Sequence, residues 1–105
     1  MPHYLYRVQP TRIGMVTDES TPEEERAISE LFKRLQLLME QGVVLLAGRS
    51  LNNDENTFAM VIFKADSDEA AREIMNEDPA VKAGVLRAEL FPFFVAMISE
   101  ENADY

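Results

Sequence analysis

Three segments of strand length in this chain are apolar at most of their positions, namely Val43–Ala47, Thr57–Lys64 and Val85–Ile98. Successive side chains of a β-strand point to opposite faces of its sheet, so these strands carry apolar residues on both faces. Apolar surface left in water costs free energy in proportion to its area. The chain is therefore expected to fold into a sheet that is covered on each side.

A fourth strand and two helices complete the pattern. Tyr4–Arg12 alternates in the manner of a strand, and residues 13–20 are expected to form a turn and a polar loop. Pro22–Gln41 repeats apolar residues at the spacing of one helix face, and Thr21 and Glu24 are placed for a capping box at its start. A shorter helix opens at the Asp-Ser-Asp-Glu run after the third strand.

The resulting order, β-α-β-β-α-β, is that of the α+β, ferredoxin-like arrangement. Its four-stranded antiparallel sheet has the strand order 4-1-3-2, and both helices pack on one face. The last strand then lies at an edge, which suits Pro92 because proline has no backbone N–H to donate. With 105 residues, the chain is expected to form a single domain over residues 1–105.

The second face of this sheet decides the expected assembly. Helices cover one face only, and the apolar surface left on the other exceeds what a soluble monomer normally exposes. An identical sheet related by a two-fold axis is the simplest cover, and it would close a barrel around a cavity. We therefore expect a homodimer in the form of a dimeric α/β barrel. The alternative is that this face tolerates its apolar residues without a partner.

Composition excludes several classes of function. The chain has no Cys, a single His and a net charge of -9. A disulfide scaffold, a thiolate zinc site and a Cys nucleophile are excluded, and no metal or cofactor is expected. The negative charge repels nucleic acid and anionic membranes. No apolar run is long enough to span a bilayer and the N-terminus lacks the features of a signal peptide, so a cytoplasmic location is expected.

Asp78 and Pro79 have two interpretations. Asp is a preferred N-cap and Pro a preferred first helical residue, so the pair could start a helical turn that runs to Ala83. The functional interpretation is a carboxylate directed into the cavity. The local sequence leaves both open.

Four charged residues lie on or beside strands: Arg7, Arg49, Arg87 and Glu89. If their face is covered by a partner, each needs an opposite charge or a ligand. Arg49 could bind an anionic small molecule. Arg87 and Glu89 could equally pair across strands or face solvent at an edge.

The first strand carries Tyr4, Tyr6 and His3. The two tyrosines could line a pocket with their hydroxyls or merely fill it with their rings. His3 could act as a base or a metal ligand. Because no second ligand lies near it in the sequence, a solvated terminal histidine is expected instead.

Two stretches resemble the YCII-related (YciI-like) family of the dimeric α/β-barrel superfamily. They are RLQLLMEQGVVLLAG, from Arg34 to Gly48, and NEDPAVKAGVLRAELFPF, which begins at Asn76. The shared motifs are an E-x-G turn, a strand ending in Ala-Gly, a D-P-x-x-x-A-G segment and a last strand ending in Pro-Phe. The resemblance implies a ferredoxin-like protomer and a homodimer.

The resemblance also implies a site. The family pattern places a His–Asp pair in the cavity, and some relatives act on chlorinated hydroxyquinones. The Asp corresponds to Asp78, whereas the His position is Leu31, and the proline that follows Ala-Gly in the family is Arg49 here. Family-type acid–base chemistry therefore lacks its imidazole. Leu31 is expected to pack as core or as cavity wall.

Three functions stay open, and so does the question of whether the chain is an enzyme. The first is a catalytically degenerate small-molecule-binding protein, with Asp78, Arg49, Tyr4 and Tyr6 around the cavity. The second is an active lyase, isomerase or dehalogenase that uses Asp78 on a small aromatic or quinone-like substrate. The third is a non-catalytic protein-interaction subunit. A cavity with a buried carboxylate and a nearby proton acceptor would favour the enzyme, an apolar cavity with one Arg the binding protein, and a filled interior the third function.

Overall fold

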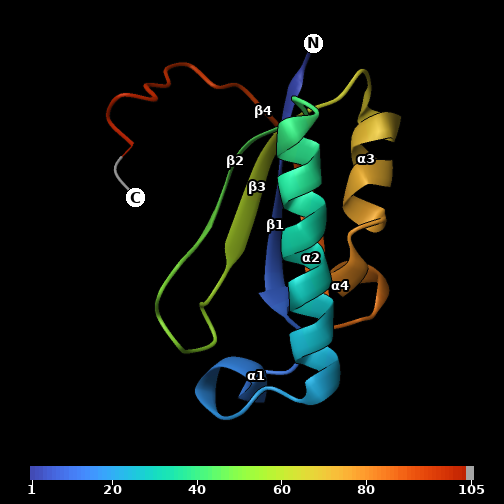
Figure 1. Cartoon of the computed structure of the whole chain (residues 1–105), viewed down its shortest axis with the longest axis vertical. Coiled ribbons are helices and arrows are strands. Elements are labelled where there is room, and N and C mark those ends of the chain that lie inside the picture. Colours follow the sequence, from blue (N-terminus) through green and yellow to red (C-terminus); the bar gives the residue numbers. More distant parts are fainter. Residues whose placement is uncertain (104–105) are drawn as a thin grey trace.

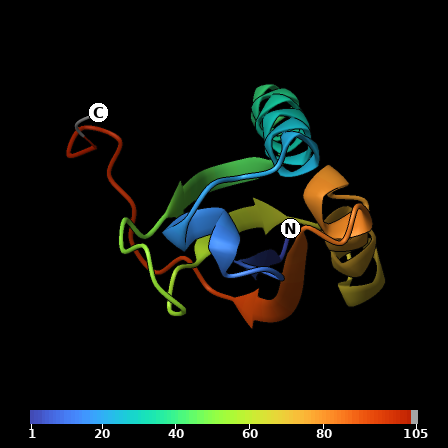
Figure 2. The same cartoon turned by 90° about the horizontal axis from the view of Figure 1, so that it is seen from below.

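The computed structural model describes residues 1–103. In chain order its elements are β1 (His3–Pro10), α1 (Gly14–Thr17), α2 (Pro22–Glu40), β2 (Val44–Arg49), β3 (Ala59–Lys64), α3 (Asp68–Asn76), α4 (Pro79–Lys82) and β4 (Leu86–Phe93). The strands form one antiparallel sheet with the order β2-β3-β1-β4 (Figure 1). Figure 2 shows α2, α3 and α4 on one side of this sheet. The α+β, ferredoxin-like topology is confirmed, with β4 at the edge that Pro92 predicts.

The long helix α2 begins and ends where its sequence predicts. The Thr21 hydroxyl accepts a hydrogen bond from the backbone N–H of Glu24 at 3.1 Å, and the Glu24 carboxylate accepts one from the Thr21 N–H at 2.8 Å. This is the expected capping box. The helix ends at Glu40, and Gly42 follows with a φ of 79°, a left-handed conformation that glycine adopts without strain.

The core lies between the sheet and its helices. Along β1 the side chains of Tyr4, Tyr6 and Val8 are buried, and the residues between them are only partly buried. Across the sheet Tyr4 pairs with Phe63 and Tyr6 with Val61. The Tyr6 ring meets the Phe63 ring edge-on, with 5.7 Å between the ring centroids. The period of two predicted for the first strand therefore places its aromatic face against the helices.

A β-bulge changes which face the residues of β2 occupy. Simple alternation predicts Val43, Leu45 and Ala47 on one face and Val44 and Leu46 on the other. In the structure Val44 pairs with Phe63 but Leu46 pairs with Ile62, so Leu45 is an extra residue on this strand. Because one inserted residue reverses every later side chain, Ala47 and Arg49 share the helix face with Val44. The predicted alternation was wrong beyond Leu45.

Two further boundaries differ from the prediction. Residues 13–20 do not form only a loop, since Gly14–Thr17 makes one helical turn, α1. The last strand ends at Phe93 and not at Ile98. Its sole neighbour in the described residues is β1, which begins at His3, and His3 already pairs with Phe93. Beyond Phe93 no strand is available to accept or donate backbone hydrogen bonds, so pairing stops there.

The face of the sheet opposite the helices is open and mostly apolar. Alternation and register place on this open face the side chains of Leu5, Leu46, Ile62, Phe91 and Phe93. An Arg7–Glu89 ion pair, formed between directly opposed residues of β1 and β4, borders the apolar residues. After β4, residues 94–98 continue as an exposed apolar segment (Figure 1). The predicted second apolar face is confirmed.

Within residues 1–103, no helix is long and apolar enough to cross a membrane. The same part of the chain contains no cluster of three or more His, Asp or Glu side chains arranged to hold a metal ion.

The connection between β1 and α2 is held by an ion pair inside the capping box. The Arg12 guanidinium donates to both carboxylate oxygens of Glu24, at 2.9 and 2.7 Å, and also to the backbone carbonyl of Glu19 at 2.8 Å. These contacts with Arg12, together with the N–H of Thr21, lower the pKa of Glu24 to about 2. One carboxylate therefore ties this connection to the first turn of α2.

We predict that Glu24→Gln destabilises the fold at neutral pH and that the difference from wild type shrinks in acid. The folded pKa of Glu24 lies below its unfolded value, so its contribution is complete above about pH 4.5 and falls as the pH approaches 2. Urea unfolding of both proteins between pH 2 and 7 measures this convergence. Glu23→Gln, in the same helical turn but without a hydrogen-bond partner among the described side chains, is the control. A gap that stays constant across this pH range would contradict the assignment.

Candidate functional site

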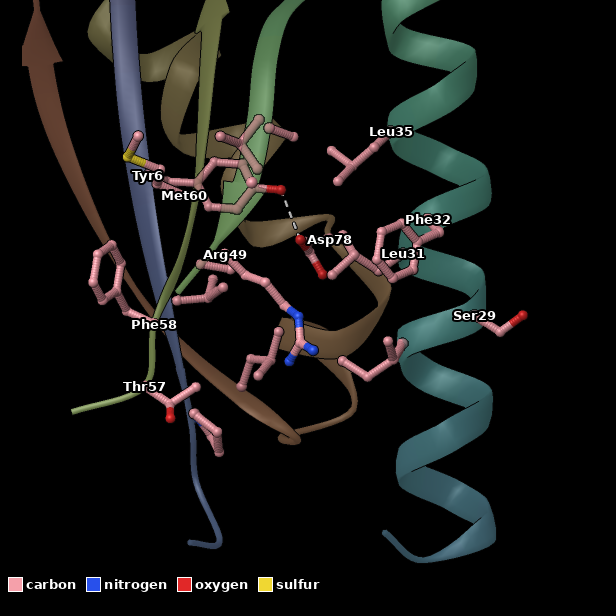
Figure 3. Close-up of a pocket in the computed structure, with 18 of the residues that line it drawn as sticks. Tyr6, Ser29, Leu31, Phe32, Leu35, Arg49, Thr57, Phe58, Met60 and Asp78 are labelled. Atoms are coloured by element: carbon pink, nitrogen blue, oxygen red, sulfur yellow. Dashed lines mark hydrogen bonds between the residues drawn. The ribbon is translucent and has the colours of Figure 1, made fainter. Parts of the chain in front are cut away.

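A large groove lies between α2 and the helix face of the sheet (Figure 3). It has a volume of about 960 Å³, within the usual range of small-molecule sites. Its walls are mostly apolar; α2 supplies Ile28, Leu31, Phe32, Leu35 and Met39, and the strands supply Val8, Ala47 and Val61. Met15 and Val16, in α1, also line it. We refer to this space as the α2 groove.

Asp78 lies at the floor of the α2 groove and is fully buried, with 0% of its surface exposed. Its Oδ1 accepts hydrogen bonds from the backbone N–H groups of Ala80 at 2.9 Å and Val81 at 3.2 Å. Its Oδ2 accepts one from the Tyr6 hydroxyl at 2.7 Å. Asp78 is therefore the N-cap of α4, as one interpretation of the sequence predicts, and it also lines this groove on the helix side of the sheet.

Tyr6 supplies the only side chain that donates to Asp78 in the described structure. Burial raises the pKa of Tyr6 well above its ordinary value, and the neighbouring Asp78 carboxylate raises it further. The phenol therefore keeps its proton at neutral pH and uses it to donate the hydrogen bond to Asp78. Oδ2 retains an acceptor position, as does the Tyr6 oxygen. Because Asp78 and Tyr6 are 0% and 1% exposed, these acceptor positions lie beneath the surface of the groove.

Arg49 enters the same groove from the edge strand β2. The bulge at Leu45 turns it to the helix face, and Figure 3 shows its guanidinium extending toward α2 below Asp78. Among residues 1–103, no carboxylate lies within 4.0 Å of this guanidinium, and it makes no hydrogen bond. Arg49 is thus an exposed cation that faces an apolar space.

The other sequence candidates lie outside the groove. Tyr4 donates its hydroxyl hydrogen bond to Asp68 of α3 at 2.7 Å, which raises its pKa, and it does not line the groove. Arg7 pairs with Glu89 across β1 and β4. Arg87 donates to the side chain of Gln9 and the carbonyl of Pro10. Arg87 and Glu89 thus contact residues of β1 across strands and are also exposed at the sheet edge, so the two alternatives for them hold at once.

His3 pairs with Phe93 at the start of β1 and is partly exposed on the open face. It shares neither a strand face nor the groove with Asp78, which lies on the helix side. His3 therefore does not take the place of the base that position 31 lacks.

Leu31 is buried in the core and also lines the α2 groove, as expected. Figure 3 shows its side chain extending from α2 toward Asp78. The helical spacing of apolar residues also predicts that Phe32 is buried on this face of α2, but Phe32 is 59% exposed and forms groove wall. The sequence did contain a signal for this exposure. The apolar stripe of α2 is wider than the part of a helix surface that packing against a sheet edge can bury, so some of its residues must stay exposed.

The sequence matches a known protein family, and the fold is similar to that of solved structures. A family model described as YCII-related domain matches residues 11–93. The chain belongs to the YCII-related family. The match covers the motifs on which the resemblance rested, including the Asp78–Gly84 segment. Among curated proteins, none matches the sequence.

Two solved structures are similar to this YCII-related chain. One is the 5-chloro-2-hydroxyhydroquinone dehydrochlorinase TftG from Burkholderia phenoliruptrix, in complex with 2,5-dihydroxybenzoquinone. It has a TM-score of 0.54 and 15% identity, covering 87% of this chain and 93% of the enzyme. The other is a hypothetical protein of Arabidopsis thaliana solved in solution, with a TM-score of 0.45 and 15% identity over 93% and 91% of the two chains. The first likeness shows a shared fold.

We predict that Tyr6→Phe destabilises this YCII-related protein by about 2 kcal/mol, because it leaves a buried carboxylate oxygen without its donor. Tyr4→Phe is the matched control, since its partner Asp68 is exposed and water can replace the hydroxyl. Chemical denaturation of both variants gives the comparison. Equal losses of unfolding free energy would show that the Tyr6–Asp78 hydrogen bond stabilises the fold no more than the Tyr4–Asp68 hydrogen bond does.

Proposed function

We propose that the chain binds a small molecule in the α2 groove, with Arg49 as its exposed polar group and the buried Tyr6–Asp78 pair beneath its floor. The observation that carries this proposal is a fully buried carboxylate at the floor of an apolar groove of about 960 Å³. A few polar groups set in an apolar wall are typical of small-molecule sites. An open groove also argues against a purely structural interaction subunit, for which a filled interior was expected.

The solved dehydrochlorinase supports this class of ligand. A protein of the same fold holds 2,5-dihydroxybenzoquinone, which is a small ring with polar substituents. A molecule of that kind has an apolar body and a few polar groups, and the α2 groove offers the same combination on its walls.

A second candidate is proton transfer with Asp78 as acceptor, which would make the chain a lyase, isomerase or dehalogenase. The observation in its favour is the acceptor position left on Oδ2. Two features weigh against it. Three hydrogen bonds already stabilise the carboxylate, and the residue beside it on α2 is Leu31, which cannot move a proton. Binding without chemistry therefore has the stronger support.

We predict that Phe32→Glu abolishes small-molecule binding while the fold survives, because Phe32 is exposed and lines the groove. Ligand-detected NMR with a library of small aromatic compounds supplies the measurement. Leu37→Glu, on the same helix and 51% exposed but outside the groove, is the control. Hits that bind Phe32→Glu and wild type equally would refute the groove as the site. Turnover of a hit by wild type but not by Asp78→Asn would favour the enzyme.

We also propose that two copies of the chain pair through the open face. The face carries exposed Phe91 and Phe93, and the adjoining Phe94 and Met97 are 80% and 92% exposed. Covering such a continuous apolar surface releases ordered water and is the usual driving force of homodimers. The Arg7–Glu89 ion pair beside it matches opposite charges, but the buried Nε of Arg7 has no hydrogen-bond partner among the described residues, so the partner copy would have to supply an acceptor.

We predict a solution mass of twice 11.9 kDa at micromolar concentration by light scattering. Phe91→Glu places a charge on the open face, on its edge strand β4, and is expected to give a folded monomer. Leu37→Glu, which adds the same charge on α2, should remain dimeric. A wild-type monomer would overturn the proposed dimer and leave the groove proposal untouched.

A further inference from the structure

One edge of the sheet lacks the features that usually prevent further strand pairing. The two edge strands are β2 and β4. Strand β4 carries Arg87, Glu89 and Pro92, which are residue types that protect an edge from a foreign strand. Residues 44–48 of β2 include no charged residue and no proline, and residues 46–48 are exposed. The β2 edge is therefore open to a strand from outside the sheet.

The backbone of β2 has hydrogen-bonding groups that point out of this edge. Ser50 donates its N–H to the carbonyl of Phe58 at 2.8 Å, so its backbone groups face β3. Hydrogen-bonded positions alternate along an antiparallel ladder, and Arg49 and Ala47 occupy the positions between them. The N–H and C=O groups of Arg49 and Ala47 therefore point away from β3, where an added strand could bind them.

The segment that follows β4 has the composition of a strand but no sheet to pair with. Residues 94–98 read Phe-Val-Ala-Met-Ile, and we call them the C-terminal segment. Phe94, Met97 and Ile98 are 80%, 92% and 64% exposed. Within residues 1–103, the structure records no backbone hydrogen bond for this segment. After β4 the chain turns away from the sheet (Figure 1 and Figure 2).

The C-terminal segment is too short to pair with β2 of its own chain. A strand outside β2 would lie four strand spacings from β4, or roughly 19 Å. Five extended residues span roughly 17 Å, so the crossing would use the whole segment. In this structure the segment and the side chains of Leu45, Leu46 and Ile62 line a hollow of about 370 Å³, which the segment does not fill. Pairing along β2 therefore needs a segment from another copy.

We infer that the C-terminal segment of one copy adds a fifth strand to the β2 edge of its partner, and that the partner returns the same contact. The inference rests on the proposed dimer, which brings the two copies together. The exchange satisfies an unpaired edge and an unpaired segment at once, and it buries apolar side chains that are otherwise exposed. Ala47, Gly48 and Arg49 also line the α2 groove, so the added strand would extend the wall of that groove.

The first test measures the dimer Kd of full-length variants by light scattering on dilution. Val95→Pro combined with Ala96→Pro disrupts the C-terminal segment, because two successive prolines remove a donor whichever alternation it adopts. Ala47→Pro removes an outward N–H from the β2 edge, a position where proline does not disturb the pairing with β3. We expect each variant to raise the Kd about a hundredfold, since undocking the segment returns at least two large apolar side chains to water.

Ala88→Pro is the matched control for Ala47→Pro. In the ladder between β1 and β4, Thr11 donates its N–H to the carbonyl of Val85 at 3.0 Å. Alternation from this pair directs the N–H of Ala88 out of the β4 edge. The same substitution thus falls at an outward position of the other edge strand, and we expect it to leave the dimer Kd unchanged.

Two NMR measurements locate the contact. In the wild-type dimer the amide protons of Ala47 and Arg49 should exchange with solvent at least tenfold more slowly than in the double-proline variant. The chain has no Cys, so Ala96→Cys carries a nitroxide label at one site only. Unlabelled chains with this nitroxide, equilibrated with ¹⁵N-labelled wild type, should broaden the amide signals of Ala47 and Arg49, which shows that the contact joins two copies.

The outcomes separate the strand exchange from the dimer itself. A dimer whose Kd is unchanged by the double-proline variant, or whose Ala47 and Arg49 amides exchange as fast as in that variant, would stand without the exchange. If Ala88→Pro weakens the dimer as much as Ala47→Pro, the effect is not specific to the β2 edge and the inference is wrong. A wild-type monomer at micromolar concentration would overturn the dimer and the exchange together.

Discussion

The hydrogen bond between Tyr6 and Asp78 is the contact on which the rest of the site depends. It joins the central strand β1 to the first turn of α4, two elements that are more than seventy residues apart in the chain. The carboxylate is fully buried, so every one of its hydrogen bonds must come from the protein or from a ligand. Because Tyr6 and the two N–H groups of α4 supply three, the carboxylate is held in one orientation. The floor of the groove is therefore rigid before any ligand arrives.

A single inserted residue brings Arg49 into the groove. Without the bulge at Leu45, regular alternation from Val44 would place Arg49 on the open face, near the Arg7–Glu89 pair. With it, the guanidinium faces the helices. The bulge therefore separates two electrostatic environments: the Arg7–Glu89 ion pair on the open face and, in the groove, a cation with no ion-pair partner among the described residues.

Parts of the fold and of the site could be predicted from the sequence, and other parts could not. Strand order, the capping box at Thr21 and the apolar second face follow from periodicity and turn chemistry, which are local signals. The face of Arg49 was not predictable, because a bulge depends on pairing with β3 and no glycine marks the position. The same holds for Tyr4 and Tyr6. Both occupy one strand face, yet only the packing of α3 and α4 decides that one meets Asp68 and the other Asp78.

Leu31 and Arg49, the two positions at which the chain departs from the pattern that the family resemblance implies, line the same groove. A leucine beside Asp78 removes the group that would exchange a proton with a ligand, and it makes the wall around the carboxylate more apolar. Arg49 adds a positive charge that attracts an anion to the groove. It does not transfer a proton, because the guanidinium group stays protonated. Each change alone is ambiguous. Together they fit the proposed binding function: neither side chain moves a proton, and Arg49 adds a charge that would hold an anionic group.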